Sequence, residues 1–274
     1  MSASARTART TRRARSASDS KAAHWLARGG LVARGVIYIL IGWLAITLAV
    51  GKSTREADQR GALQLVAKQP FGLFLLWLLG IGFAAYALWR LSEAVFGVTV
   101  DGKGAGPRLK SLARAIVYAL FAVTTFSVIQ GGRKSQSSQE SDLSATVMRH
   151  SLGQWVVGIV GVIVVIVGLV LALEGWRRKF VKYLNTGQMS PKTRSIVIRL
   201  GMIGTIARGV VFMVVGALIV DAAVTYQPAK AGGLGTALST LRKQPFGEFI
   251  LLAVALGLLI FGVYGLCEAR WRKV

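Results

Sequence analysis

Residues 33–50 read ARGVIYILIGWLAITLAV, an Ala-Arg pair followed by an apolar run long enough to cross a membrane. The same opening returns at Ala113-Arg114 and at Ala207-Arg208. Each arginine is followed 59 or 60 residues later by a glutamate that closes a second apolar run. The three pairs are Arg34 with Glu93, Arg114 with Glu174, and Arg208 with Glu268. A period kept this closely indicates one supersecondary unit present three times.

The apolar residues, which make up 53% of the 274, are gathered into six blocks. A helix needs about 20 residues to cross about 30 Å of hydrocarbon, and each block approaches or exceeds that length. The blocks lack the polar face of a helix on the surface of a soluble protein. The sequence therefore predicts an all-α polytopic membrane protein with six transmembrane helices. The blocks are 31–50, 71–91, 112–129, 154–173, 200–220 and 249–267.

Because each repeat crosses the membrane twice, all three repeats have the same orientation. Parallel repeats are related by an axis along the membrane normal, so we expect three tandem helical hairpins with pseudo-threefold symmetry. The predicted repeats cover 24–97, 108–178 and 199–272. Residues 1–22 are rich in arginine and serine without large apolar residues, which predicts a disordered basic tail.

The net charge of +23 is distributed unevenly. Of the 34 Lys and Arg residues, 24 lie in the tails and linkers on one side, and the other 10 lie on the opposite side. This bias is the positive-inside signal, and it predicts a plasma-membrane protein with both termini in the cytoplasm. Anionic lipid headgroups are the expected partners, at about 1 kcal/mol per basic residue near the surface. No nucleic-acid-binding motif accompanies the charge, so nucleic acid is not expected, and the sequence identifies no protein partner.

A second repeated motif opens the second helix of each repeat. Gly72, Gly153 and Gly247 each stand 21 residues before their glutamate. Two of these glycines end an identical stretch, in which proline is expected to occupy the first helical turn. Short segments ahead of them, at 62–68, 143–149 and 237–243, are expected to lie in the membrane interface. The identical stretches are Lys68-Gln69-Pro70-Phe71-Gly72 and Lys243-Gln244-Pro245-Phe246-Gly247, and the middle repeat has His150-Ser151-Leu152-Gly153 instead.

The chain resembles a bacterial membrane family catalogued as domain of unknown function 1206. The resemblance rests on Ala-Arg-Gly-Val followed by an aromatic residue two positions later, on Gln-Pro-Phe-Gly, and on the closing Glu-Ala at 93–94 and 268–269. It covers nearly everything after residue 27 as three copies. The second copy departs at Ala115, Leu152 and Gly175. The resemblance implies a multi-pass membrane protein and attaches no activity to it.

The arginines and glutamates are the best candidates for a functional site. In an antiparallel hairpin the start of the first helix and the end of the second share one membrane face, so each arginine is expected to pair with the glutamate of its own repeat. Each charge opposes its helix dipole at a cost of roughly 0.3–1 kcal/mol, which an ion pair would offset. Two interpretations remain open: a packing clamp, or a cytoplasmic ring of clamps that binds an anionic lipid or gates an axial cavity.

Aromatic residues follow the arginines by four positions, which places them on the same helix face. They are expected to support the guanidinium groups. These residues are Tyr38, Tyr118 and Phe212. Glycines within the second helices favour packing inside one bundle over a homodimer face. These glycines are Gly158, Gly161, Gly257, Gly262 and Gly265.

Several function classes find no support. The six apolar blocks carry no ionisable residue between their boundaries, which disfavours ion-coupled transport. His24 and His150 fall on opposite sides of the membrane, so neither metal nor haem is expected, and Cys267 is the single cysteine. No phosphate-binding loop or nucleophile elbow is present. We therefore expect a non-enzymatic component, without cofactor, that organises lipid or protein. The alternative is a passive channel or transporter for a small or amphiphilic molecule along the pseudo-threefold axis.

Overall fold

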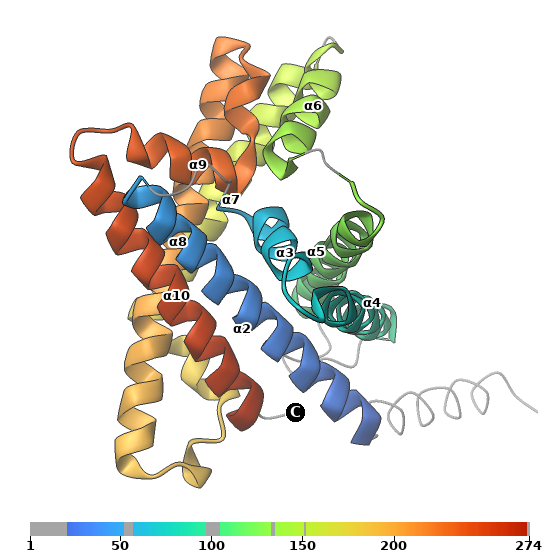
Figure 1. Cartoon of the computed structure of the whole chain (residues 1–274), viewed down its shortest axis with the longest axis vertical. Coiled ribbons are helices and arrows are strands. Elements are labelled where there is room, and N and C mark those ends of the chain that lie inside the picture. The colour runs from blue at the N-terminus through green and yellow to red at the C-terminus, as the bar shows by residue number, and fades with distance from the viewer. Residues whose placement is uncertain (1–20, 52–56, 97–104, 133–134, 151, 273–274) are drawn as a thin grey trace, which may run out of the picture.

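The structure, a computed structural model, describes residues 21–51, 57–96, 105–132, 135–150 and 152–272 (Figure 1). Within these residues the chain is helical and contains one isolated β-bridge. The predicted basic tail lies outside the described residues except for Lys21 and Ala22, and these two already belong to the first helix. The predicted all-α class is confirmed.

Six described helices are long and apolar enough to cross a membrane, which confirms the predicted number of spans. Three shorter α-helices and three 3-10 helices connect them. The six long helices are α2 (Lys21–Ala49), α4 (Gly72–Phe96), α5 (Ala105–Ile129), α7 (Gly153–Trp176), α8 (Pro191–Thr225) and α10 (Gly247–Trp271). The shorter elements are α3 (Gln59–Ala67), α6 (Gln136–Met148), α9 (Gly233–Arg242), η1 (Lys179–Tyr183), η2 (Thr186–Gln188) and η3 (Pro228–Ala231).

The bundle has two distinct ends. We call the end that carries the connections between repeats the linker end, and the opposite end, which carries α3, α6 and α9, the short-helix end. Every first helix of a repeat, α2, α5 or α8, runs from the linker end to the short-helix end. Every second helix, α4, α7 or α10, runs back, so the three tandem hairpins are parallel to one another.

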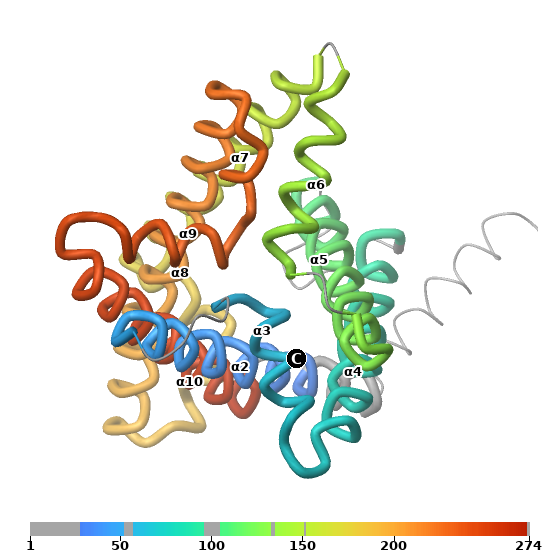
Figure 2. Tube along the Cα trace, turned by 45° about the horizontal axis from the view of Figure 1, so that its top comes forward, coloured from blue at the N-terminus to red at the C-terminus, as the bar shows by residue number. Residues whose placement is uncertain are grey.

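The first helix of each repeat packs most extensively against the second helix of a different repeat. The pairs are α2 with α10, α5 with α4, and α8 with α7. The α2–α10 pair contacts both of the others, through α2 against α4 and α10 against α8 (Figure 2). The helices α5 and α7, although they belong to one repeat, have almost no contact. The repeats therefore exchange partners in a cycle, as pseudo-threefold symmetry requires.

Small residues make these exchanged pairs possible. A Cβ atom added to Gly35 of α2 would lie 2.9 Å from the carbonyl oxygen of Gly262 in α10. At the equivalent place, a Cβ atom on Gly209 of α8 would lie 2.7 Å from the carbonyl oxygen of Gly168 in α7. Close backbone approach through small residues is the usual basis of helix association in membranes. Glycines of the second helices thus serve packing inside one chain, the use that the sequence favoured.

The glycine that opens each second helix has the same role in all three repeats. A Cβ atom at Gly72 would lie 2.0 Å from the carbonyl oxygen of Val66, near the end of the preceding short helix. At Gly153 the corresponding distance is 1.7 Å, to Val147, and at Gly247 it is 2.2 Å, to Arg242. Only glycine permits this sharp turn between a short helix and a membrane helix.

The prolines before these glycines lie outside the helices, which corrects the expectation of a first-turn position. Helices α4 and α10 begin at the glycines, two residues after Pro70 and Pro245. The intervening Phe71 and Phe246 have positive φ values of 61° and 58°. A left-handed residue cannot continue a right-handed helix, so the proline belongs to the turn. Both phenylalanine side chains are highly exposed, as aromatic anchors at a membrane boundary are.

Large apolar side chains fill the centre of the bundle. Leu76, Phe83, Leu251 and Leu258 are each at most 1% exposed, and they come from α4 and α10. Helix α3 adds Leu63 to the same core from the short-helix end. Apolar side chains on the outer helix surfaces remain exposed, which suits a bundle surrounded by lipid.

Candidate charged site at the linker end

Charged side chains from all three repeats gather near the linker end of the bundle. They include every arginine and glutamate of the predicted clamps, together with two arginines that the motif does not contain. Three of these side chains share one carboxylate, two others form a second group, and three have no ion-pair partner among the described residues. The charged residues are Arg34, Arg90, Arg114, Arg208, Arg272, Glu93, Glu174 and Glu268.

Glu268 holds the most complete of these groups. Nη2 of Arg34 donates to Oε2 of Glu268, and Nη1 of Arg272 donates to Oε1. The glutamate is 6% exposed, and the guanidinium of Arg34 also lies 5.4 Å from the centre of the Phe261 ring. The predicted pairing of Arg34 with Glu93 is therefore wrong. Helix α2 packs chiefly against α10, so the carboxylate that Arg34 meets belongs to the third repeat.

Glu93 is occupied by a residue from its own helix. Nη1 of Arg90 donates to Oε2 of Glu93 at 2.6 Å, and the hydroxyl of Ser111 donates to the same oxygen at 3.1 Å. Nε and Nη2 of Arg90 also donate to the Tyr86 hydroxyl, at 3.0 and 2.6 Å. The guanidinium stacks 4.5 Å from the Trp89 ring. Arg90 is only 4% exposed, so this is a buried and well-satisfied group.

Arg114 has no comparable partner. It forms no hydrogen bond or ion pair with any described residue, and its predicted pair with Glu174 is absent. The reason is the near absence of contact between α5 and α7, which carry the two residues. The nearest charges that act on Arg114 are those of Arg90 and Arg272, both of the same sign. The rings of Tyr86 and Tyr183 are also within electrostatic reach.

Arg208 turns toward aromatic rings instead of a carboxylate. Its guanidinium carbon lies 5.1 Å from the Phe261 ring centre, 5.2 Å from that of Phe212 and 5.6 Å from that of Tyr38. The predicted pair with Glu268 is not formed, because that carboxylate is held by Arg34 and Arg272. Within the described part of the chain Arg208 forms no ion pair, and Glu174 forms none either.

The predicted aromatic support for the arginines is only partly present. Phe212 lies against Arg208 of its own helix, as expected, but Tyr38 supports the same Arg208 rather than Arg34. Tyr118 packs instead among aromatic rings, with centres 4.4 Å from Tyr86 and 6.0 Å from Phe83. The exchange of helix partners again explains the difference, since each aromatic side chain faces a neighbouring repeat.

The connection between the second and third repeats folds against this site. Leu184 forms a β-bridge with Arg272 and is 1% exposed. The backbone N–H of Asn185 donates to the carbonyl of Trp271 at 2.7 Å. Tyr183 lies with its ring centre 5.5 Å from the Arg272 guanidinium. The linker therefore helps to fix Arg272 and brings a tyrosine to the charged cluster.

Sequence reasoning did not single out Arg90, Arg272 or Tyr183. A signal for Arg90 exists: counted back from the closing glutamate, its place is taken by Leu171 in the second repeat and by Gly265 in the third. An arginine found in one copy only could have been noticed by aligning the repeats. The linker around Tyr183 carries no repeat pattern, so no comparable signal pointed to it.

The chemistry available at the linker end is that of anion recognition. Five arginines face three carboxylates, so the cluster carries surplus positive charge. A guanidinium presents a planar fork of donors that matches phosphate and carboxylate oxygens. Among the described residues there is no group of three potential metal ligands. The cluster suits binding of a negatively charged group.

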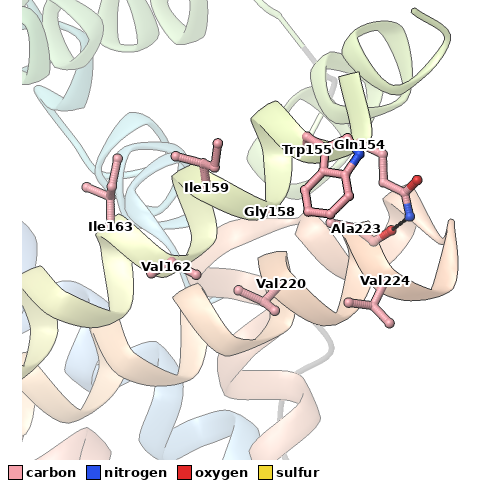
Figure 3. Close-up of a pocket in the computed structure, with 9 residues that line it drawn as sticks. All are labelled: Gln154, Trp155, Gly158, Ile159, Val162, Ile163, Val220, Ala223 and Val224. Atoms are coloured by element: carbon pink, nitrogen blue, oxygen red, sulfur yellow. Dashed lines mark hydrogen bonds between the residues drawn. The ribbon is translucent and has the colours of Figure 1, made fainter. Parts of the chain in front are cut away.

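A separate groove lies on the outer surface between α7 and α8 (Figure 3). It has a volume of about 450 Å³ and lies nearer the short-helix end. Its one polar side chain with a visible bond is Gln154, whose Nε2 donates to the carbonyl of Ala223 at 2.8 Å. An apolar surface at this depth suits contact with hydrocarbon. The lining residues are Gln154, Trp155, Gly158, Ile159, Val162, Ile163, Val220, Ala223 and Val224.

Comparison with known proteins finds the same repeats. The model of a family described as Domain of Unknown Function (DUF1206) matches residues 29–97, 109–178 and 203–272. This confirms the resemblance inferred from the sequence, in three tandem copies. The chain is also 32% identical, over 250 residues, to an uncharacterized protein, YxxB, of Bacillus subtilis (strain 168), and 90% of each chain is covered. No solved structure matches.

Proposed function

Since the chain belongs to the DUF1206 family, which has no assigned activity, we propose its function from its own residues. We propose that it is a non-enzymatic component of the plasma membrane that holds anionic lipid headgroups at its cytoplasmic face. In this proposal the linker end of the bundle lies in the cytoplasm. A role in organising a partner protein is the second form of the same proposal.

The observation that carries the proposal is the surplus of arginine at the linker end. Arg114 and Arg208 have no carboxylate partner among the described residues, although both lie at the ends of membrane helices. An unpaired charge at a membrane boundary is costly unless a counter-charge is supplied. Lipid phosphate groups lie at that depth and carry the required charge. The surplus therefore favours lipid phosphate as the counter-charge.

The distribution of basic residues supports the proposed orientation. The side of the chain that includes the linker end holds 24 of the 34 Lys and Arg residues. Positive charge is retained on the cytoplasmic side during insertion, and the anionic cytoplasmic leaflet attracts it further. Both effects favour the orientation in which the surplus arginines meet anionic lipid.

The filled core favours this function over a pathway along the pseudo-threefold axis. A pathway would require a small or polar lining, and the centre instead contains fully buried Leu76, Phe83 and Leu258. Side chains packed at the density of a protein interior leave no room for a permeating molecule. The passive channel therefore remains the weaker proposal.

Native mass spectrometry of the protein, extracted gently from its own membrane, tests the proposed function. The expected result is a reproducible added mass of an anionic phospholipid. It should be lost when Arg114 and Arg208 are both replaced by glutamine. It should persist when the exposed Arg194 and Arg199 of α8 are replaced in the same way, which removes equal charge. A bare monomer would contradict lipid binding, and a defined complex with another protein would favour the partner-organising form.

A further inference from the structure

Arg114 differs from its counterparts because a neighbouring arginine has taken its expected carboxylate. The cyclic exchange brings α5 against α4, so the carboxylate equivalent to the one that Arg34 binds is Glu93. That carboxylate is held instead by Arg90 and Ser111. In the intact junction, the position of Arg90 is occupied by Gly265, which leaves Glu268 available to Arg34. The extra arginine thus releases Arg114.

The surroundings of Arg114 then concentrate positive charge. Arg90 and Arg272 are the charged groups that act most strongly on it, and both repel it. Each of these two has its own carboxylate, Glu93 or Glu268, which holds it in place. Arg114 is itself half-buried. Three guanidinium groups held near one another, one of them without a counter-charge, form a site that an anion would stabilise.

The kind of anion follows from the depth and from the donors. Arg114 lies one helical turn beyond Ser111, which contacts Glu93 at the closing end of α4. This is the boundary between apolar helix and linker, where the phosphate groups of a bilayer lie. Arginine binds phosphate through two parallel hydrogen bonds, which three converging guanidinium groups can supply to several oxygens at once. A carboxylate offers only two oxygens and fits such a site less well.

From these contacts we propose that Arg114, flanked by Arg90 and Arg272, binds one phosphate group at the linker end. Tyr86 and Tyr183 border the site. The phosphate is that of an anionic phospholipid or a free phosphate ion, which share the same chemistry. The inference rests on the proposed function, because it identifies the residues and the ligand group through which the linker end would hold lipid.

The test is the thermal unfolding temperature of the full chain under three conditions. The protein is placed in nanodiscs of phosphatidylcholine alone, in nanodiscs that also contain phosphatidylglycerol, and in detergent with increasing inorganic phosphate. Stabilisation by phosphatidylglycerol alone identifies the lipid source, and stabilisation by inorganic phosphate in detergent identifies a free ion. Either result supports the site if it depends on Arg114.

Dependence on Arg114 is measured with a matched pair of variants. Arg114→Gln is expected to weaken the apparent affinity for the stabilising anion by about tenfold or more, because a charge-assisted bond is lost. Arg199→Gln removes the same charge from an exposed position on α8 and should leave the affinity unchanged. Arg114→Lys keeps the charge without the fork and should have an intermediate effect. If Arg114→Gln does not fold, the comparison of Arg114→Lys with Arg199→Lys decides.

The outcomes separate this inference from the proposed function. Stabilisation by phosphatidylglycerol that Arg114→Gln and Arg199→Gln retain equally would overturn the site while lipid binding stands. Stabilisation by inorganic phosphate alone, lost in Arg114→Gln, would support the site and contradict the lipid function. No stabilisation of the wild-type protein under any condition would overturn both.

Discussion

Two junctions between repeats carry the same motif and end in different contacts. At the α2–α10 junction, Arg34 of the first repeat binds Glu268 of the third, and Arg272 completes the group. At the α4–α5 junction, the equivalent Arg114 is excluded from Glu93, which binds Arg90. The helices pair in the same way at both places. The difference arises from single side chains rather than from the fold.

The comparison shows how a repeated scaffold can acquire a site. An intact junction uses its arginine and glutamate to satisfy each other, which leaves nothing for a ligand. Where an extra arginine is present, one guanidinium is released and surplus charge appears. Loss of symmetry between copies is therefore a better guide to function here than the motif that the copies share.

The largest expected effect is at the intact junction. Glu268→Gln leaves both Arg34 and Arg272 without a carboxylate, and breaking a buried ion pair on one side costs about 3–5 kcal/mol. Unfolding in detergent micelles measures this loss as a lower transition midpoint. Glu174→Gln is the control, because Glu174 forms no ion pair within the described residues, and a change within about 0.5 kcal/mol is expected there. Equal losses in the two variants would contradict the assignment of the intact clamp.

The glycine contacts that create the junctions come next. Gly209→Ala would place a Cβ atom 2.7 Å from the carbonyl oxygen of Gly168, so the α7–α8 pair must separate. We expect a loss of about 1–3 kcal/mol, the usual cost of overpacking. The same change at Gly82 of α4, which has open space around it, should stabilise the protein by about 0.5–1 kcal/mol. The two variants should therefore shift the unfolding midpoint in opposite directions, and shifts of the same sign would be incompatible with the packing.

A smaller effect is expected from removing the extra arginine. Arg90→Ala frees Glu93 for Arg114, so only the stacking of Arg90 on Tyr86 and Trp89 is lost, at about 1 kcal/mol. Glu93→Gln, by contrast, leaves two arginines without a carboxylate and should cost about 3–5 kcal/mol. Comparison of the two unfolding free energies sharpens the difference between the junctions. A loss in Arg90→Ala as large as that in Glu93→Gln would mean that Arg114 does not take the vacated carboxylate.

The smallest effect is expected at Arg208. Its contacts are three aromatic rings, and Arg208→Gln leaves no buried carboxylate behind, so a loss of about 0.5–1 kcal/mol is expected. Arg34→Gln should cost more, since Glu268 then keeps only Arg272. Chemical unfolding of the two variants side by side gives the order. A larger loss at Arg208 would indicate a contact beyond the aromatic rings.

Most of the architecture could be predicted from the sequence. Long apolar runs and a close period indicate six membrane helices in three hairpins, because both are properties of segments along the chain. The glycines before the second helices were found by the same period, and the turn at Gly72 explains why glycine is needed. The turn position of Pro70 was missed, since the left-handed conformation of Phe71 has no sequence signature.

The partners of the charged residues could not be predicted in the same way. In a ring of parallel hairpins the first helix has a second helix on either side, one from its own repeat and one from another. A sequence period is identical for both arrangements, so Arg34 could be assigned to Glu93 or to Glu268 with equal right. Packing of Gly35 against Gly262 decides between them, and that contact is visible only in the structure.

The exchange of partners between repeats is tested most directly by two double-mutant cycles on Arg34. One cycle combines Arg34→Gln with Glu268→Gln, and the other combines Arg34→Gln with Glu93→Gln, with unfolding free energy as the measured quantity. A coupling of about 1.5–3 kcal/mol is expected for Arg34 with Glu268, and one within about 0.5 kcal/mol for Arg34 with Glu93. The reverse result, with Arg34 coupled to Glu93, would show that each hairpin closes on itself and would contradict the account.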